Sequence, residues 1–141
     1  MSKLLTKILG NDKKFFNEIQ VKQDLIDTII NAAENSHPNE FSALLTGEIK
    51  NNILLITNLM IVPSIASNEG ATMNILMAPE FIESLGSVHS HPGTSARPSQ
   101  ADLQFFSKTG LFHMIIAEPY TQNTIKSYTR HGDPVHYRII P

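Results

Sequence analysis

The chain has 141 residues, of which 41% are hydrophobic and 17% charged, with a formal net charge of -2 at pH 7. This length is typical of one domain with its own core, and the charge balance excludes general disorder and a generally basic nucleic-acid surface. The absence of cysteine excludes disulfides, thiol catalysis and cysteine-ligated metals, which leaves histidine and carboxylate as metal ligands. We therefore expect a single cytoplasmic domain whose partners are neither nucleic acid nor membrane, and the oligomeric state stays open.

The N-terminal segment has apolar runs that lysines interrupt, so we expect neither a signal peptide nor a membrane span in it. We predict an N-terminal helix or arm over residues 1–19, with a membrane-surface helix as the less favoured alternative. From Val21 to Asn35 apolar residues recur at helical spacing, which predicts a helix with one buried face. Pro38 should end this helix before Ser36, because proline disfavours helical geometry in the residue that precedes it.

The rest of the chain predicts a sheet protein. Strands are expected at 41–47, 53–62, 73–77, 87–91, 111–117, 124–128 and 135–140, with a turn at 51–52, a loop at 63–72 and a short helix at 79–85. A further helix should begin at Ser99 and end at a Gly110 cap. This pattern predicts an α/β or α+β domain, with a mixed sheet and helices packed on it.

The segment HSHPGTSARPSQAD, residues 89–102, carries the chemistry. His89 and His91 are two residues apart, so on a strand their side chains point to the same face. Ser99 and Asp102 open the following helix, and the loop between is long enough to fold that helix start back over the strand end. Two imidazoles and one carboxylate with an open fourth position are typical of a catalytic zinc site.

Each part of this motif also has an ordinary structural explanation. Ser99 and Asp102 have the spacing of a capping box, and a His-x-His pair on a strand is more often polar decoration than a metal site. Taken alone, each part favours that explanation. At their combined spacing the parts predict a metal site instead.

The combined motif matches the signature of the JAMM (MPN-plus) metalloproteases: His-x-His, seven residues, Ser, two residues, Asp. The chain resembles the minimal prokaryotic members most, over about residues 20–140. A helix ending in His37-Pro38-Asn39-Glu40, followed by FSALLTG, is similar to the family segment that carries an upstream catalytic glutamate. The resemblance implies the cytidine-deaminase-like JAMM/MPN fold.

The resemblance also implies a role for each matching residue. His89, His91 and Asp102 would bind one Zn²⁺, Glu40 would be the general base, and Ser99 would donate a hydrogen bond to the developing oxyanion. These roles agree with what amide hydrolysis needs, namely an activated water, a stabilised oxyanion and a protonated leaving nitrogen. Arg97 is a weaker candidate for steering the substrate, the alternative being a solvated loop arginine.

The function that the resemblance implies is a zinc metalloisopeptidase. Its substrates would be conjugates of a ubiquitin-like modifier or a sulfur-carrier protein, cleaved after the carrier's C-terminus. The alternative is a catalytically inactive MPN scaffold, although such relatives typically lack the ligands that this chain keeps. A zinc nucleobase deaminase is excluded because its pattern requires cysteine ligands.

Residues outside the motif are weaker candidates. We do not expect a ligand among the four remaining histidines, which are His37, His113, His131 and His136. Asn68, Glu69 and Thr72 lie in a loop that would line a substrate groove or simply be exposed.

Overall fold

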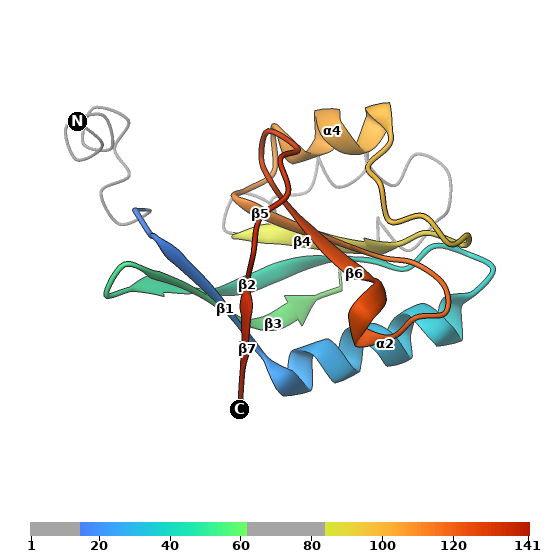
Figure 1. Ribbon diagram of the computed structural model, residues 1–141, viewed down its shortest axis with the longest axis horizontal. Helices are drawn as coiled ribbons and strands as arrows, with labels where there is room; N and C mark the ends of the chain where they lie inside the picture. The colour runs from blue at the N-terminus through green and yellow to red at the C-terminus, as the bar shows by residue number, and fades with distance from the viewer. Residues whose placement is uncertain (1–14, 62–83) are drawn as a thin grey trace.

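The computed structural model describes residues 15–61 and 84–141 as a seven-stranded mixed sheet with a helix on each face (Figure 1). The elements are β1 (Glu18–Lys22), α2 (Gln23–Ser36), β2 (Ser42–Lys50), β3 (Ile53–Met60), β4 (Gly86–Ser90), α4 (Gln100–Phe106), β5 (Phe112–Ile116), a 3₁₀ turn η4 (Gln122–Thr124), β6 (Ile125–Thr129) and β7 (Arg138–Ile140). The strand order is β6-β5-β4-β2-β3-β1-β7. This confirms the predicted mixed sheet flanked by helices. The elements expected at 73–77 and 79–85, the loop at 63–72 and most of the N-terminal arm lie outside the described residues.

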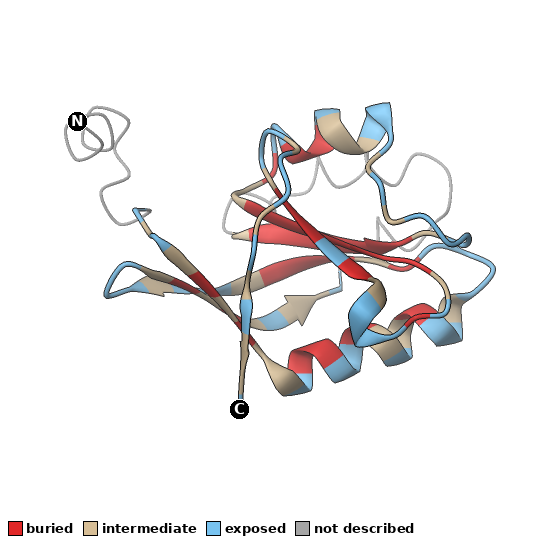
Figure 2. Ribbon diagram, viewed as in Figure 1, coloured by how far each residue is buried: buried red, intermediate tan, exposed pale blue. Residues whose placement is uncertain are grey.

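The two faces of the sheet carry two separate cores. The larger core lies against α2 and includes Ile26, Ile29 and Val88, whereas the smaller lies against α4 and includes Leu44 and Ile115. Figure 2 shows buried residues along the central strands between the two helices. Because side chains alternate along a strand, and His89 is paired with Ile115, the histidine lies on the face that α4 covers. The predicted motif therefore occupies the α4 face.

Central strand β4 pairs with β2 on one side, antiparallel, and with β5 on the other, parallel. Strands β2 and β3 form a hairpin whose turn residues Asn51 and Asn52 have φ angles of 53° and 65°. Asparagine tolerates this left-handed geometry, which two-residue hairpins require, so the predicted turn is confirmed. Within the described ranges no helix is long and apolar enough to cross a membrane.

The start of the first helix was predicted wrongly. Val21 lies in β1, which pairs with β3 and β7, and the helix begins only at Gln23. Residues 18 and 19, expected in an N-terminal helix or arm, also belong to this strand. The buried positions Ile19 and Val21 alternate as in a strand, and Lys22 caps α2 without any side-chain hydrogen bond. Since no capping residue marks the boundary, the helical spacing of Val21 was misleading.

The end of the second helix was also predicted wrongly. Helix α4 ends at Phe106, four residues before the expected glycine cap. The hydroxyls of Ser107 and Thr109 donate to the carbonyls of Gln104 and Phe105, at 2.7 and 2.6 Å, and so satisfy the last turn. Gly110 has a φ of 132° and packs closely on Gly86. A Cβ added at Gly110 would lie 2.9 Å from the Gly86 Cα.

Gly86 is required by the pairing of β4 with β5, which gives a stability prediction. A Cβ at this position would lie 1.6 Å from the carbonyl oxygen of Phe112, so the two strands would have to separate. We expect Gly86→Ala to lower the free energy of unfolding by about 3 kcal/mol, measured by urea denaturation. Gly93→Ala is the matched control, because nothing lies within 4 Å of its Cβ position. Equal stability of the two variants would contradict the prediction.

Candidate metal centre

Three side chains from two elements meet on the α4 face of the sheet. His89 lies in β4, His91 follows directly after its end, and Asp102 lies in the first turn of α4. The two Nε2 atoms are 3.1 Å apart, and each is 3.2 Å from one carboxylate oxygen of Asp102. Tetrahedral zinc with bonds of about 2.0–2.1 Å would hold its ligand atoms roughly 3.3 Å apart. The two Nε2 atoms, and each Nε2 with its nearer carboxylate oxygen, thus lie close to the spacing that such a site needs.

The orientation of His91 favours a metal ligand. Its Nδ1 atom lies 2.8 Å from the Ser95 carbonyl oxygen, which can only accept, so Nδ1 carries a proton. Nε2 is the ring atom that faces His89 and Asp102: in the neutral ring it carries the lone pair that a metal would need, and in the protonated ring it donates to Asp102. A backbone carbonyl that fixes the tautomer in this way is the usual outer partner of a metal-binding histidine.

Asp102 is held in its ionised form. Burial raises the pKa of Asp102, but hydrogen bonds from His89 and His91 outweigh this and hold it well below its usual range. The hydrogen bond with Asp102 correspondingly raises the pKa of His91. A cation therefore suits this place, since an ionised carboxylate lies 3.2 Å from the Nε2 atom of each ring. Within the described ranges these are the only His, Asp or Glu side chains clustered closely enough to hold a metal ion.

The predicted capping box is present as well. Ser99 Oγ accepts from the Asp102 backbone N–H at 3.0 Å, and Asp102 Oδ2 accepts from the Ser99 N–H at 2.9 Å. The cap and the metal site are therefore not alternatives, because the cap fixes the carboxylate that faces the histidines. The Ser99 hydroxyl uses only a lone pair in this cap, so its proton stays available for a further acceptor.

Glu40 lies beside the same centre, on the turn before β2. Ser42 pairs with His89, and continuing this antiparallel register by two residues sets Glu40 opposite His91. The backbone N–H of Phe41 donates to Ser90 Oγ at 2.8 Å, which ties the turn to the end of β4. Glu40 is exposed, and its charge is among the smaller contributions that raise the pKa of His91. Strand pairing thus brings this glutamate within electrostatic range of His91.

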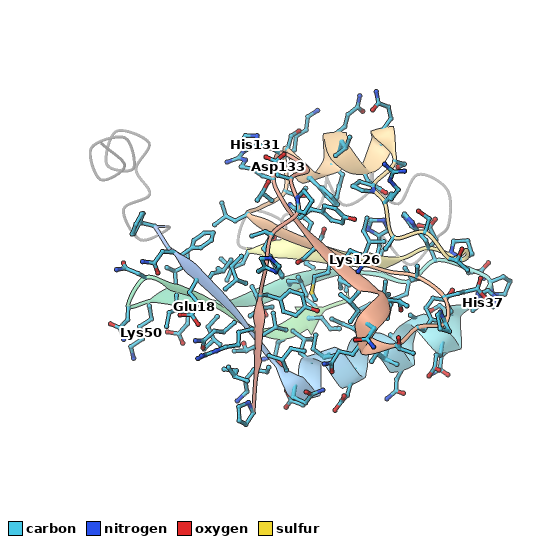
Figure 3. The ribbon with its side chains drawn as sticks, in the orientation of Figure 1. Glu18, His37, Lys50, Lys126, His131 and Asp133 are labelled. Carbon is cyan, nitrogen blue, oxygen red and sulfur yellow. The ribbon has the colours of Figure 1, made fainter. Side chains whose placement is uncertain are left out.

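The remaining candidates lie apart from the ligand cluster. Arg97 is exposed in the loop before α4, and its predicted role stays a prediction. Figure 3 places His37 at the end of α2 and His131 in the turn beside α4. Neither of these histidines belongs to the cluster, nor do His113 and His136. The groove residues predicted at 68, 69 and 72 lie outside the described part of the chain.

Sequence reasoning missed the partners that hold the site. Ser95 orients the His91 ring through its carbonyl, and Tyr128 donates to the Ala96 carbonyl at 2.7 Å, which fastens the same loop to β6. These contacts involve backbone oxygens. No side-chain pattern in the sequence signals them.

His113 is a buried histidine next to the site. It lies on β5 with no exposed surface, bonds Ser87 at 2.7 Å through Nδ1 and stacks on Phe106 at a ring distance of 4.3 Å. Its Nε2 has no hydrogen-bond partner. Burial lowers the pKa of His113 from 6.5 to about 3. The ring is therefore neutral in the folded protein, which agrees with the predicted core role.

This pKa gives a predicted pH dependence of stability. Between pH 6.5 and 3 the unfolded chain binds a proton at His113 that the folded chain does not, so the stabilisation is complete above 6.5 and is lost as the pH falls. We expect a loss of up to about 1.4 kcal/mol per pH unit in this window. Urea denaturation at a series of pH values measures the free energy of unfolding of wild type and of His113→Leu. The difference between their slopes against pH isolates the contribution of His113. Parallel stability curves would contradict the prediction.

The fold and the donor set define a layered α/β protein with a cluster of side chains that could hold a metal ion, and comparison with known proteins gives its family. Residues 22–131 match the family of prokaryotic homologs of the JAB domain. A probable metalloprotease of Haloferax volcanii is 31% identical over 122 residues, which cover 82% of this chain and 75% of that protein. The chain therefore belongs to the prokaryotic JAB domain family, as the JAMM resemblance implied.

Solved structures agree with this assignment. One, described as a JAMM metalloprotease-like zinc site in the proteasome and signalosome, is 32% identical with a TM-score of 0.68, covering 89% of this chain and all of that one. A JAB1/MPN domain protein from Archaeoglobus fulgidus is 31% identical with a TM-score of 0.67, covering 89% and 99%. A protein from Desulfitobacterium hafniense, 24% identical, shares the fold, with a TM-score of 0.61 and coverage of 86% and 91%.

Proposed function

We propose that this protein is a zinc metalloisopeptidase that cleaves the bond after the C-terminus of a ubiquitin-like modifier or sulfur-carrier protein. The observation that carries the proposal is the convergence of His89, His91 and Asp102 beside Glu40 and Ser99. The two histidines and the aspartate are the proposed ligands of one Zn²⁺. Ion, base and oxyanion donor are the groups that amide hydrolysis needs.

Each residue of the site would have a separate role in amide hydrolysis. Bound zinc would lower the pKa of a water molecule and polarise the scissile carbonyl. Glu40 takes a proton from the attacking water and delivers it to the departing amine, for which its exposed position before β2 is suited. Ser99 donates its free hydroxyl proton to the carbonyl oxygen as that oxygen becomes negative. Ser95 keeps the His91 ring in one orientation throughout.

The substrate class rests on family membership and on the compactness of the chain. The relative from Haloferax volcanii is called a probable metalloprotease, and one structural relative is described in connection with the proteasome and signalosome. Only residues 107–111 separate α4 from β5, so no long insertion after Asp102 grips a second protein. A small modifier or carrier with a free C-terminal tail suits such a site better than a substrate that must be held at two places.

The test uses a ubiquitin-like protein joined through its C-terminal glycine to a lysine side chain. Zinc-loaded protein should release the modifier with an intact C-terminus, which mass spectrometry identifies, and removing the metal by chelation should stop the release. Readdition of zinc should restore it. Zinc stoichiometry is measured in the same samples. A zinc stoichiometry near zero would decide for the inactive scaffold. A stoichiometry near unity without cleavage of either a ubiquitin-like modifier or a sulfur-carrier protein would refute the proposed substrate class.

A further inference from the structure

Both backbone polar groups of His91 are anchored to the end of β5 and the segment that follows it. The His91 N–H donates to the carbonyl of Ile116 at 2.9 Å. Its carbonyl accepts from the hydroxyl of Tyr120 at 3.1 Å. His91 lies just beyond the last residue of β4, so its N–H continues the pairing with β5 by one bond and the Tyr120 hydroxyl satisfies its carbonyl.

The Tyr120 hydroxyl has a second partner, which is His37 at the end of α2. It lies 2.9 Å from Nδ1 of His37, and the two rings meet edge to face at 5.7 Å. Because the hydroxyl donates its proton to the His91 carbonyl, its oxygen accepts from His37 Nδ1–H. His37 caps the end of α2 and precedes Glu40 by three residues. One hydroxyl thus connects the turn that carries Glu40 with the backbone of a proposed zinc ligand.

The backbone of Tyr120 is held in an unfavourable conformation. Its φ angle is 61°, in the left-handed region that a bulky aromatic residue rarely adopts. Strained residues of this kind persist only where the surroundings hold them, and they gather at functional sites. The ring is buried in the larger core, with 7% of its surface exposed, and the Tyr120 N–H donates to the Ala117 carbonyl at 2.8 Å.

We propose that Tyr120 is a positioning residue that sets the spacing between Glu40 and the metal ligands by bridging His37 and His91. Register alone sets Glu40 opposite His91, yet Glu40 precedes the first residue of β2 and His91 follows the last residue of β4. Neither residue is inside a strand, and the backbone bond that joins the two strand ends is made by their neighbours, from the Ser90 N–H to the Phe41 carbonyl at 2.9 Å. The bridge adds a side-chain connection between the two strand ends to the contacts of Phe41 with Ser90, and the inference rests on the proposed function.

The first test is Tyr120→Phe, which removes the hydroxyl and keeps the buried ring. Two readouts are needed: the zinc dissociation constant by competition with a chromophoric chelator, and kcat and KM for the modifier conjugate. We expect zinc affinity to fall about tenfold and kcat to fall 10–100-fold, with KM within about twofold of wild type. Tyr137→Phe is the matched control, because Tyr137 packs on Phe112 at the opposite end of β5 from the site.

The second test changes His37, which makes one of the two hydrogen bonds of the Tyr120 hydroxyl. His37→Ala removes the donor to Tyr120 and should lower kcat about tenfold, whereas His37→Asn keeps an N–H near the Nδ1 position and should retain activity. The inference is overturned if Tyr120→Phe matches wild type in zinc affinity and kcat, if Tyr137→Phe shows equal losses, or if His37→Asn is as impaired as His37→Ala. Failure of wild type itself to bind zinc or cleave would instead refute the proposed function.

Discussion

Replacing Glu40 by glutamine should abolish most of the cleavage while leaving the zinc in place. Glutamine has the size of glutamate and keeps a hydrogen-bonding carbonyl oxygen, but at neutral pH it cannot accept the proton of the attacking water. Loss of a general base typically costs 10²–10⁴-fold in rate, so we expect kcat to fall by about that factor. Because Glu40 is outside the cluster of His89, His91 and Asp102, the zinc dissociation constant should stay within about twofold.

The matched control is Glu48→Gln, the same substitution at an exposed position in the far half of β2. It should cleave at the wild-type rate, since Glu48 lies eight residues along the chain from Glu40. A Glu40→Gln protein that cleaves as fast as wild type would show that the base is another group. If Glu40→Gln lost zinc, Glu40 would be a ligand and the predicted division between ligands and base would be wrong.

The proposed ligands could be predicted because their chemistry depends on residue type and short spacing. Two histidines two apart share one face of a strand, and a serine and an aspartate three apart form a capping box wherever a helix begins. Both are local rules, so they apply before the fold is known. Glu40 is different: its separation from the histidines along the chain carries no local signal, and only the resemblance to a family pointed to it. The antiparallel register of β2 and β4 supplies the physical reason.

What the sequence did not predict depends on long-range pairing and on backbone groups. Strand β1 was missed because Ile19 and Val21 suit a strand only when β3 and β7 lie on either side of it. Tyr120 was missed because its partners are a carbonyl 29 residues away and a ring 83 residues away. Neither contact leaves a pattern in the sequence, since a tyrosine after a proline is an ordinary turn residue.

Asp102 gives the second large effect, because it belongs at once to the cap of α4 and to the proposed metal site. Asparagine at this position keeps a side-chain oxygen that can accept from the Ser99 N–H, but it lacks the charge that both histidines face. We expect Asp102→Asn to lower zinc affinity by more than about 100-fold and to remove measurable cleavage, since outer partners alone are typically worth 10–100-fold. Chelator competition and the cleavage assay measure the two losses.

Asp102→Ala separates the two roles, because it removes the side-chain acceptor of the Ser99 N–H as well as the ligand. Its metal-free form should unfold about 1 kcal/mol more easily than that of Asp102→Asn, whereas the two should bind zinc equally poorly. Asp133→Asn, in the exposed turn beside α4 (Figure 3), is the control and should retain both zinc and activity. If Asp102→Asn bound zinc as tightly as wild type, the carboxylate would serve only the cap. The third ligand would then have to come from elsewhere, and Glu40, which the extended strand register sets opposite His91, is the first candidate.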